Sequence, residues 1–320
     1  MNISWKIILL VVGVSTLALR FLLDSAFATT TLVYIAVPFL ISVALAFFTK
    51  NSESVSLGAR YANHLRMSTI VFLATSVILF EGFICVVMFM PIYYSFVSVG
   101  FAASALFEPP KDKQSANDLN NTFKAYALPV IVLMLVTEGL TPMTTVERNG
   151  TATYVAESDQ SIEQLQANMA KPIAFGEDRH WFLKLFPLPD QVFAGSLKQG
   201  DVHKLHFTYN RWIFTNEHKG EMHVKIAKVS ADHIRTEITR NDSYLANYMR
   251  IDGTDVRFTP LPNGKTHVAL TVRYERSLDP AWYFGPMQHV AARQSAKQFL
   301  TDIIMRHPVE EVDEGTFHGA

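Results

Sequence analysis

The sequence predicts an α+β protein, with an N-terminal bundle of about five transmembrane helices followed by an antiparallel sheet packed on a long C-terminal helix. Charge supports this division, because only eight of the 28 Lys and Arg residues and seven of the 29 Asp and Glu residues precede residue 144. The hydrophobic pattern also changes at about residue 149, where long apolar runs give way to alternation with a period of two. We therefore expect residues 1–143 in the membrane and residues 144–308 in a folded domain outside it.

Composition and motifs exclude several classes of protein. The formal net charge is -1 and no basic run occurs, so the electrostatic footprint of a nucleic-acid-binding protein is missing. The single cysteine, Cys85, lies in an apolar run and has no partner for a disulfide or a cysteine metal site. No P-loop, Rossmann fingerprint, Gly-x-Ser-x-Gly or His-Glu-x-x-His motif occurs. We expect no cofactor and no nucleic-acid partner.

Apolar runs of about 20 residues are long enough to cross a bilayer as helices. The run at 69–107 is too long for one span, and we divide it at Pro91, which precedes Tyr93 and Tyr94. Proline interrupts helices, and tyrosine prefers the membrane interface. The predicted spans are about 5–23, 31–48, 69–89, 93–107 and 126–142.

Orientation follows from the basic residues of the short loops. The loops at 49–67 and 108–125 each contain three Lys or Arg residues, whereas the segment at 24–30 has none. Both basic loops should lie in the cytoplasm, which places the C-terminal domain on the extracytoplasmic side. We therefore expect a multi-pass protein of the cell inner membrane, with the lipid bilayer as a partner.

The first apolar run has a second interpretation, as a cleavable signal peptide. Lys6 precedes the run, and residues 25–28 (SAFA) offer an Ala-x-Ala cleavage pattern. Arg20 and Asp24, within and just after the run, disfavour cleavage. Whether residues 1–28 are removed stays open.

Two carboxylates lie inside predicted spans, Glu81 and Glu138, and each is followed by glycine. Glycine lets a neighbouring helix approach closely, and a buried carboxyl group can bond to that neighbour. These acids are interpreted as structural contacts between helices. The alternative is a proton or cation path with Arg20 as counter-ion, although no internal repeat typical of transporters is visible.

The C-terminal half begins with a predicted strand at 150–158 and a helix at 159–170, capped by Asp159 or Ser158. Short connections at 230–231 (SA) and 262–264 (PNG) indicate hairpins in an antiparallel meander. The further strands are predicted at 201–209, 221–229, 232–240, 251–259 and 265–275. The tail at 309–320 is acidic and polar, and we expect it to be disordered.

Each strand has one apolar face, which a long amphipathic helix after Pro286 is expected to cover. The apolar positions of this helix recur at intervals of three and four residues. They are Met287, Val290, Ala291, Phe299, Leu300, Ile303 and Ile304.

The stretch LPNGKTHVALTVRYERSLDPAWYFGPMQHVAARQSAKQFLTDI, residues 261–303, resembles the helix-grip domains of the polyketide cyclase/dehydrase and lipid-transport superfamily. This superfamily includes the START domains, the birch pollen allergen and a membrane-attached bacterial subfamily. The resemblance covers about residues 149–306. It implies a deep apolar cavity between sheet and helix that holds a lipid, an isoprenoid or a polyketide-like molecule. A membrane-anchored carrier is the expected function, and a cyclase or dehydratase acting on such a ligand is the alternative.

The candidate cavity residues are the inward-facing side chains of the sheet and of the long helix. They are His203, Leu205, Phe207, Tyr209, Met222, Val224, Ile226, Thr236, Ile238, Arg240, Phe258, Leu270, Val272, Tyr274, Met287, Val290, Ala291 and Gln294. No catalytic residue is assigned. An enzyme would use His203, Tyr209 or Tyr274 as its acid or base.

Ten of the eleven histidines lie in the C-terminal half, which raises the question of a metal site. His203 and His206 are three residues apart on a predicted strand, so their side chains point to opposite faces and cannot chelate together. We expect no metal site. The aromatic segment at 180–189 is either a lid on the sheet or a loop that dips into the outer leaflet.

Overall fold

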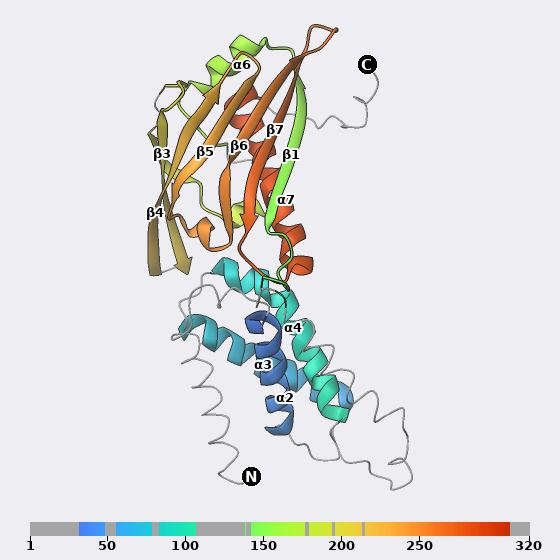
Figure 1. Cartoon of the computed structure of the whole chain (residues 1–320). Helices are drawn as coiled ribbons and strands as arrows, with labels where there is room; N and C mark the ends of the chain where they lie inside the picture. The colour runs from blue at the N-terminus through green and yellow to red at the C-terminus, as the bar shows by residue number, and fades with distance from the viewer. Residues whose placement is uncertain are drawn as a thin grey trace. The chain divides into compact units, whose positions relative to one another are not determined.

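The computed structural model describes residues 32–48, 56–78, 83–106, 138, 142–176, 179–193, 196–212 and 215–307 (Figure 1). The chain forms two compact units. The first contains the residues up to Val146 together with Leu278–Tyr283, and the second contains Glu147–Ser277 together with the chain from Phe284 onward. The predicted span at 5–23, Glu81, the tail at 309–320 and most of the span at 126–142 lie outside the described residues.

The first unit is helical. Its described elements are η2 (Leu32–Ala36), α2 (Val37–Phe48), α3 (Leu57–Ile78) and α4 (Phe83–Leu106). Among the described residues, one helix is long and apolar enough to cross a membrane, namely α4 over Val86–Ser104. The described part of the chain therefore shows one candidate span, not the bundle of five that the sequence predicted.

The predicted division of the third apolar run at Pro91 is wrong. Helix α4 continues through Pro91, and α3 begins at Leu57, inside the segment predicted as a cytoplasmic loop. Proline lacks the N–H that would bond to the carbonyl of residue 87, and this loss is tolerated in a helix that packs against its neighbours. Met88 and Ile92, on either side of Pro91, are buried.

Polar side chains join the helices of the first unit. The Tyr93 hydroxyl donates to the Ser68 carbonyl at 2.8 Å, so this tyrosine holds α4 against α3 and does not mark a helix end. Ser42 of α2 donates to the Val97 carbonyl of α4 at 2.6 Å, and its Oγ lies 2.8 Å from Nε2 of the buried His64 in α3. Such bonds between helices stabilise a bundle whose surfaces are otherwise apolar.

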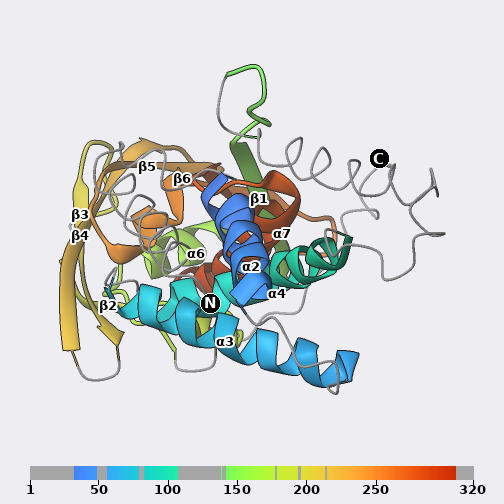
Figure 2. The ribbon, with the colours of Figure 1, turned by 90° about the horizontal axis from the view of Figure 1, so that it is seen from below.

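The second unit contains a seven-stranded antiparallel sheet in the order β1-β7-β6-β5-β4-β3-β2. The strands are β1 (Asn149–Ser158), β2 (Pro189–Phe193), β3 (Val202–Trp212), β4 (Thr215–Val229), β5 (His233–Asn241), β6 (Met249–Pro260) and β7 (Thr266–Arg276). Figure 2 shows the sheet curving from β1 through β5 to β3, with helix α7 (Ala281–Phe299) on the concave side. The predicted antiparallel α+β arrangement with a C-terminal helix is confirmed.

The meander follows the predicted turns. Ser230 N–H donates to the His233 carbonyl at 2.8 Å in the β4–β5 hairpin. Gly264 has a φ of 81°, the left-handed conformation that glycine adopts without strain, in the β6–β7 hairpin. Strand β7 alternates strictly between buried and partly buried residues, as expected of a strand whose inward face carries the core.

Register shifts interrupt the strand pairing at four positions. They lie between Pro189 and Gln191, between His223 and Val224, between Ile226 and Lys228, and between Ile251 and Gly253. Gly253 has a φ of 150°, and a Cβ atom there would overlap the Thr236 carbonyl. Beyond three residue pairs β5 and β6 separate, and the short helix η5 (Tyr244–Asn247) packs against β4 and β6.

Helix α6 (Ile162–Met169) begins later than predicted. Ser161, not Asp159 or Ser158, is its N-cap: the Ser161 hydroxyl accepts from Gln164 N–H at 3.3 Å, and the Gln164 side chain accepts from Ser161 N–H at 3.1 Å. This reciprocal pair is a capping box. The polar residues before Ser161 all favour caps, so composition alone did not select among them.

Helix α7 begins before Pro286 and ends in a π-helical turn, η6 (Leu300–Met305). Its buried stripe recurs every fourth residue and consists of Phe284, Gln288, Ala292, Ala296 and Leu300. The predicted stripe was wrong in its first half, since Val290 is 43% exposed and Met287 and Ala291 are only partly buried. Alanine side chains let the helix approach the sheet closely, but they contribute little to a hydrophobic pattern.

Candidate ligand-binding face

The inward face of the sheet has a fully packed part. Val256, Val268 and Leu270, on β6 and β7, are completely buried together with Ala292 and Ala296 of α7. Packing of this kind leaves no exposed apolar surface for a ligand. Phe258, Leu270, Val272 and Tyr274, predicted to line a cavity, all belong to this core.

The inward face of β3, β4 and β5 is covered less completely. Leu205, Met222 and Ile226 are buried there, and the buried Thr236 bonds to the Thr254 hydroxyl at 2.8 Å. Phe207, Val224 and Ile238 share the inward face but remain partly exposed. This second part of the sheet therefore presents apolar side chains that α7 does not cover.

The segment at 179–189, called the lid here, is part of the second unit and packs its apolar side chains inward. Its 3₁₀ turn, η4 (Leu183–Leu185), is held by Arg179, whose Nη1 donates to the carbonyls of Leu183 and Phe186 at 3.3 and 3.2 Å. Phe182 and Leu183 are buried, whereas Trp181 is 68% exposed. The apolar side chains of this segment thus pack inward, and Trp181 alone of its large aromatic residues points to solvent.

A series of aromatic rings connects the lid to β3. Phe182 contacts Phe186 with ring centroids 5.7 Å apart, and Phe186 contacts Tyr248 at 6.1 Å. Tyr248 contacts Tyr244 at 5.6 Å, and Tyr244 stacks on Tyr209 at 4.2 Å. Tyr209, predicted at the ligand site, is therefore buried beneath η5 instead of facing open space.

Helix α7 contributes one fully buried polar side chain, Gln288. Its Nε2 donates to the Tyr248 carbonyl at 2.6 Å, and its Oε1 has no hydrogen-bond partner among the described residues. The predicted helix residues Met287, Ala291 and Gln294 flank this stripe and are partly exposed. Sequence reasoning missed Gln288, although its spacing of four from Phe284 and Ala292 would have placed it on the same face.

The three residues named for acid or base chemistry do not converge. His203 and Tyr209 are six residues apart on β3, or roughly 20 Å at about 3.3 Å per residue. Tyr274 lies on β7, four strands away from β3, or roughly 19 Å at about 4.8 Å per strand. Of the three, His203 is bonded to the Ser196 carbonyl at 3.3 Å. Along the sheet, therefore, the three side chains start from well-separated positions.

Arg240 is not on the apolar face. The register shift next to Val224 places Arg240 opposite His223 on the outer surface. There it bonds to Glu221 at 3.3 Å and to Asp242 at 2.6 Å. The hydrogen bond from His223 and the charge of Arg240 both lower the pKa of the Glu221 carboxyl.

The histidines of β3 point to opposite faces, as predicted. His203 is buried, whereas His206 lies outward, 3.9 Å from Glu221. His233 also lies outward and bonds to Asp255 at 3.0 Å. Within the described residues, no group of three or more His, Cys, Asp or Glu side chains is suited to hold a metal ion.

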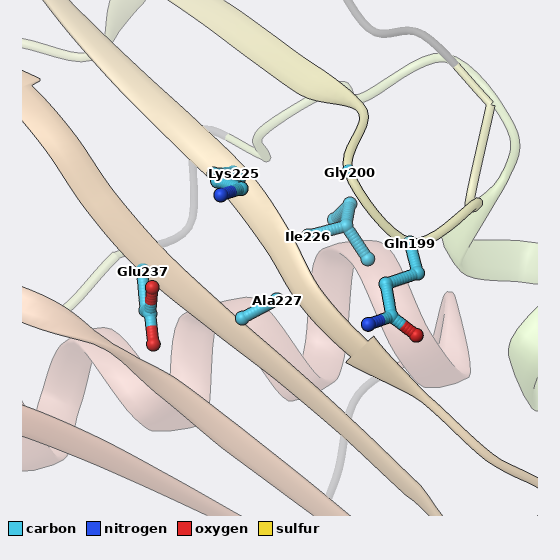
Figure 3. Close-up of a pocket in the computed structure, with 6 residues that line it drawn as sticks. All are labelled: Gln199, Gly200, Lys225, Ile226, Ala227 and Glu237. Carbon is cyan, nitrogen blue, oxygen red and sulfur yellow. The ribbon is translucent and has the colours of Figure 1, made fainter.

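A separate concavity of about 640 Å³ lies at the register shift of β4 (Figure 3). It is lined by Gln199, Gly200, Lys225, Ile226, Ala227 and Glu237. Lys225 and Glu237 are paired across β4 and β5, and both are exposed. The concavity is open and largely polar, so its chemistry does not suit an apolar ligand.

The predicted intramembrane acid Glu138 belongs to the first unit. Its Oε1 accepts a hydrogen bond from the N–H of Ala281, the first residue of α7, at 2.6 Å. A carboxylate at a helix N-terminus satisfies an otherwise unpaired N–H group. This contact is a helix-capping bond, and the choice between a structural role and a proton path stays a prediction. Glu81 lies outside the described residues.

No protein-family model and no curated protein matches the sequence. Solved structures similar to this chain include a START superfamily protein from Mycobacterium smegmatis, at 13% identity and a TM-score of 0.32 over 49% of this chain and 95% of that one. The Zhui aromatase/cyclase from Streptomyces sp. R1128 has 11% identity and a TM-score of 0.30, over 49% and 92%. Truncated norcoclaurine synthase from Thalictrum flavum has 14% identity and a TM-score of 0.29, over 49% and 96%. At these scores the likenesses add no argument about function, which depends on the geometry above.

Proposed function

We propose that the second unit binds a hydrophobic small molecule without covalent chemistry, on the inward face of β3, β4 and β5. One observation carries the proposal: Phe207, Val224 and Ile238 face the concave side of the sheet but stay partly exposed, next to a fully packed core on β6 and β7. Exposed apolar surface on a concave face is typical of a ligand site. Burying it would contribute about 25 cal/mol per Å² to affinity.

Two further features support a carrier over an enzyme. The lid at 179–189 ends at Pro189, which lies opposite Phe207 in the strand register, and its Phe182 and Phe186 are apolar side chains that would help to enclose a ligand. The candidate acids and bases His203, Tyr209 and Tyr274 come from well-separated positions along the sheet. A carrier needs only apolar surface and a few polar atoms that orient the ligand.

Co-purification tests the binding proposal. The full chain is extracted in detergent, and native mass spectrometry or solvent extraction with mass spectrometry identifies any bound lipid, isoprenoid or polyketide-like molecule. Ile238→Trp should fill the space on β5 and reduce the bound ligand severalfold. Val202→Trp is the matched control, because Val202 lies on the outward side of β3 and is 40% exposed. Equal ligand content in both variants and the parent would refute the site, as would an empty parent protein.

We also propose that the first unit anchors the protein in the inner membrane, with the second unit on the extracytoplasmic side. The apolar helix α4 and the long apolar runs support the anchor, and the Lys and Arg residues in the segments at 49–67 and 108–125 support the orientation. Anchoring would keep the site near the phase into which apolar ligands partition. Fusion of alkaline phosphatase to the C-terminus should give an active enzyme, and fusion of green fluorescent protein should give no fluorescence. The reverse result would place the C-terminus in the cytoplasm.

A further inference from the structure

The amide of Gln288 has a fixed orientation and one unused acceptor. Gln288 is 3% exposed, and its Nε2 donates to the Tyr248 carbonyl at 2.6 Å. Reversing the amide would bring two oxygens together, so the nitrogen must point at Tyr248 and the Oε1 atom must point elsewhere. Among the described residues no donor reaches Oε1, although this atom is buried.

An unpaired buried carbonyl costs free energy, so its presence calls for a physical reason. Gln288 is the only polar residue on a stripe otherwise made of Phe284, Ala292, Ala296 and Leu300. The bond to the Tyr248 carbonyl accounts for the amide nitrogen of Gln288 but not for its oxygen. The cost at Oε1 is removed if this atom gains a donor in another state of the protein.

The side chains around Gln288 indicate what kind of molecule could carry a donor to Oε1. Tyr248, which anchors the amide, contacts the rings of Tyr244 and of Phe186 in the lid. Tyr244 and Tyr248 are buried, and these rings make the surroundings of the amide apolar. A molecule that reaches Oε1 must be largely apolar and must carry a hydrogen-bond donor at the end that meets the amide.

We propose that Gln288 Oε1 accepts a hydrogen bond from a hydroxyl group of the bound ligand, which makes the ligand a hydrophobic alcohol or phenol. This inference rests on the proposed binding function. A hydrocarbon would leave Oε1 unpaired, and a ketone, a quinone or an ionised carboxylate would place a second acceptor against it. Because Oε1 is buried, neighbouring side chains must move aside when the hydroxyl enters.

The experiment compares two probes of nearly equal size, 1-naphthol and 1-fluoronaphthalene, of which only the first donates a hydrogen bond. Binding to the full chain in detergent is followed by quenching of intrinsic fluorescence. The ratio of the two affinities is measured for the parent, Gln288→Leu, Gln288→Met and the control Gln298→Leu. Gln298 lies on the same helix, is partly exposed and bonds to Asp302. Partition into micelles affects every protein equally and cancels when the ratios are compared.

We expect the preference for 1-naphthol to fall about fivefold to tenfold in Gln288→Leu and Gln288→Met, the equivalent of one net hydrogen bond, and to persist in Gln298→Leu. Two Gln288 variants are used so that one that fails to fold does not remove the test. If both probes bind but the preference is absent in the parent, or is unchanged in a folded Gln288 variant, the inference fails while the proposed function stands. If neither probe binds to the parent, both fail.

Discussion

Leu270→Ala should destabilise the second unit far more than Ile238→Ala, although both replacements shorten an aliphatic side chain on the inward face. Leu270 is completely buried, between Tyr154 on β1 and Val256 on β6 in the strand register. Ile238 lies on β5 and is partly exposed. The comparison therefore asks whether the sheet has one packed part and one incompletely covered part.

The expected magnitudes follow from the two environments. Removing a fully enclosed leucine loses its transfer free energy and leaves a cavity, which together cost about 3 kcal/mol in a range of about 2–5 kcal/mol. At Ile238 part of the side chain already contacts solvent, and no closed cavity forms. The loss there should be about 1 kcal/mol, close to the transfer term for the part that is buried.

Guanidinium unfolding of the full chain in detergent, freed of bound lipid and followed by the circular dichroism of the sheet, measures both changes. Equal slopes of free energy against denaturant would show that the variants unfold from comparable native states. The free energies of unfolding of the two variants should differ by about 2 kcal/mol. Of the two, only Ile238→Ala should weaken the binding of 1-naphthol. Equal destabilisation would refute the reasoning, because it would mean that β5 is packed as tightly as β7 and has no space for a ligand.

Three further predictions concern other parts of the chain. Gly253→Ala should destabilise the second unit by more than about 2 kcal/mol, because the new Cβ would overlap a backbone carbonyl. Gly264→Ala has open space around it and should cost about 1 kcal/mol. Equal losses of the free energy of unfolding in denaturant would contradict this prediction. Ser42→Ala should lower the stability of the first unit by about 1–3 kcal/mol in detergent, because it leaves His64 Nε2 without its partner, and an unchanged melting temperature would refute the contact. Burial raises the pKa of Tyr274, so its contribution to stability should be complete below about pH 10 and lost as pH rises toward the folded-state pKa. Tyr274→Phe should reduce this loss of stability at alkaline pH. An unaltered dependence of stability on pH in the variant would contradict the prediction.

The strands could be predicted from the sequence because their signal is local. Alternation marks β3 to β7, and the turns at Ser230 and Gly264 follow from their own residue types. The opposite directions of His203 and His206 follow from the same period of two. Strand β2 was missed because it is short, begins with proline and has little alternation.

Other features depend on tertiary structure that no local pattern contains. Arg240 lies off the apolar face because β5 contains one extra residue, Thr239, between Ile238 and Arg240, and a single inserted residue reverses which side a residue takes. The buried stripe of α7 was predicted wrongly because two of its five positions are alanines and one is Gln288. A hydrophobic pattern gives alanine little weight and assigns glutamine to the exposed face. Pro91 was predicted to end a helix, whereas α4 continues through it, with Met88 and Ile92 buried on either side.

An incompletely covered face is compatible with a stable fold only if the packed part supplies the stability. Domains are stable by about 5–15 kcal/mol, so several apolar side chains can stay uncovered provided that residues such as Leu270 and Ala296 remain enclosed. The same division makes binding measurable without a known ligand. A molecule that covers Val224 and Ile238 binds the folded state alone, and at 100 times its dissociation constant it would add about 2.7 kcal/mol to the free energy of unfolding. The melting temperature of the second unit should therefore rise with the concentration of a suitable alcohol, and it should rise less in Ile238→Trp, where the added ring occupies the ligand's place.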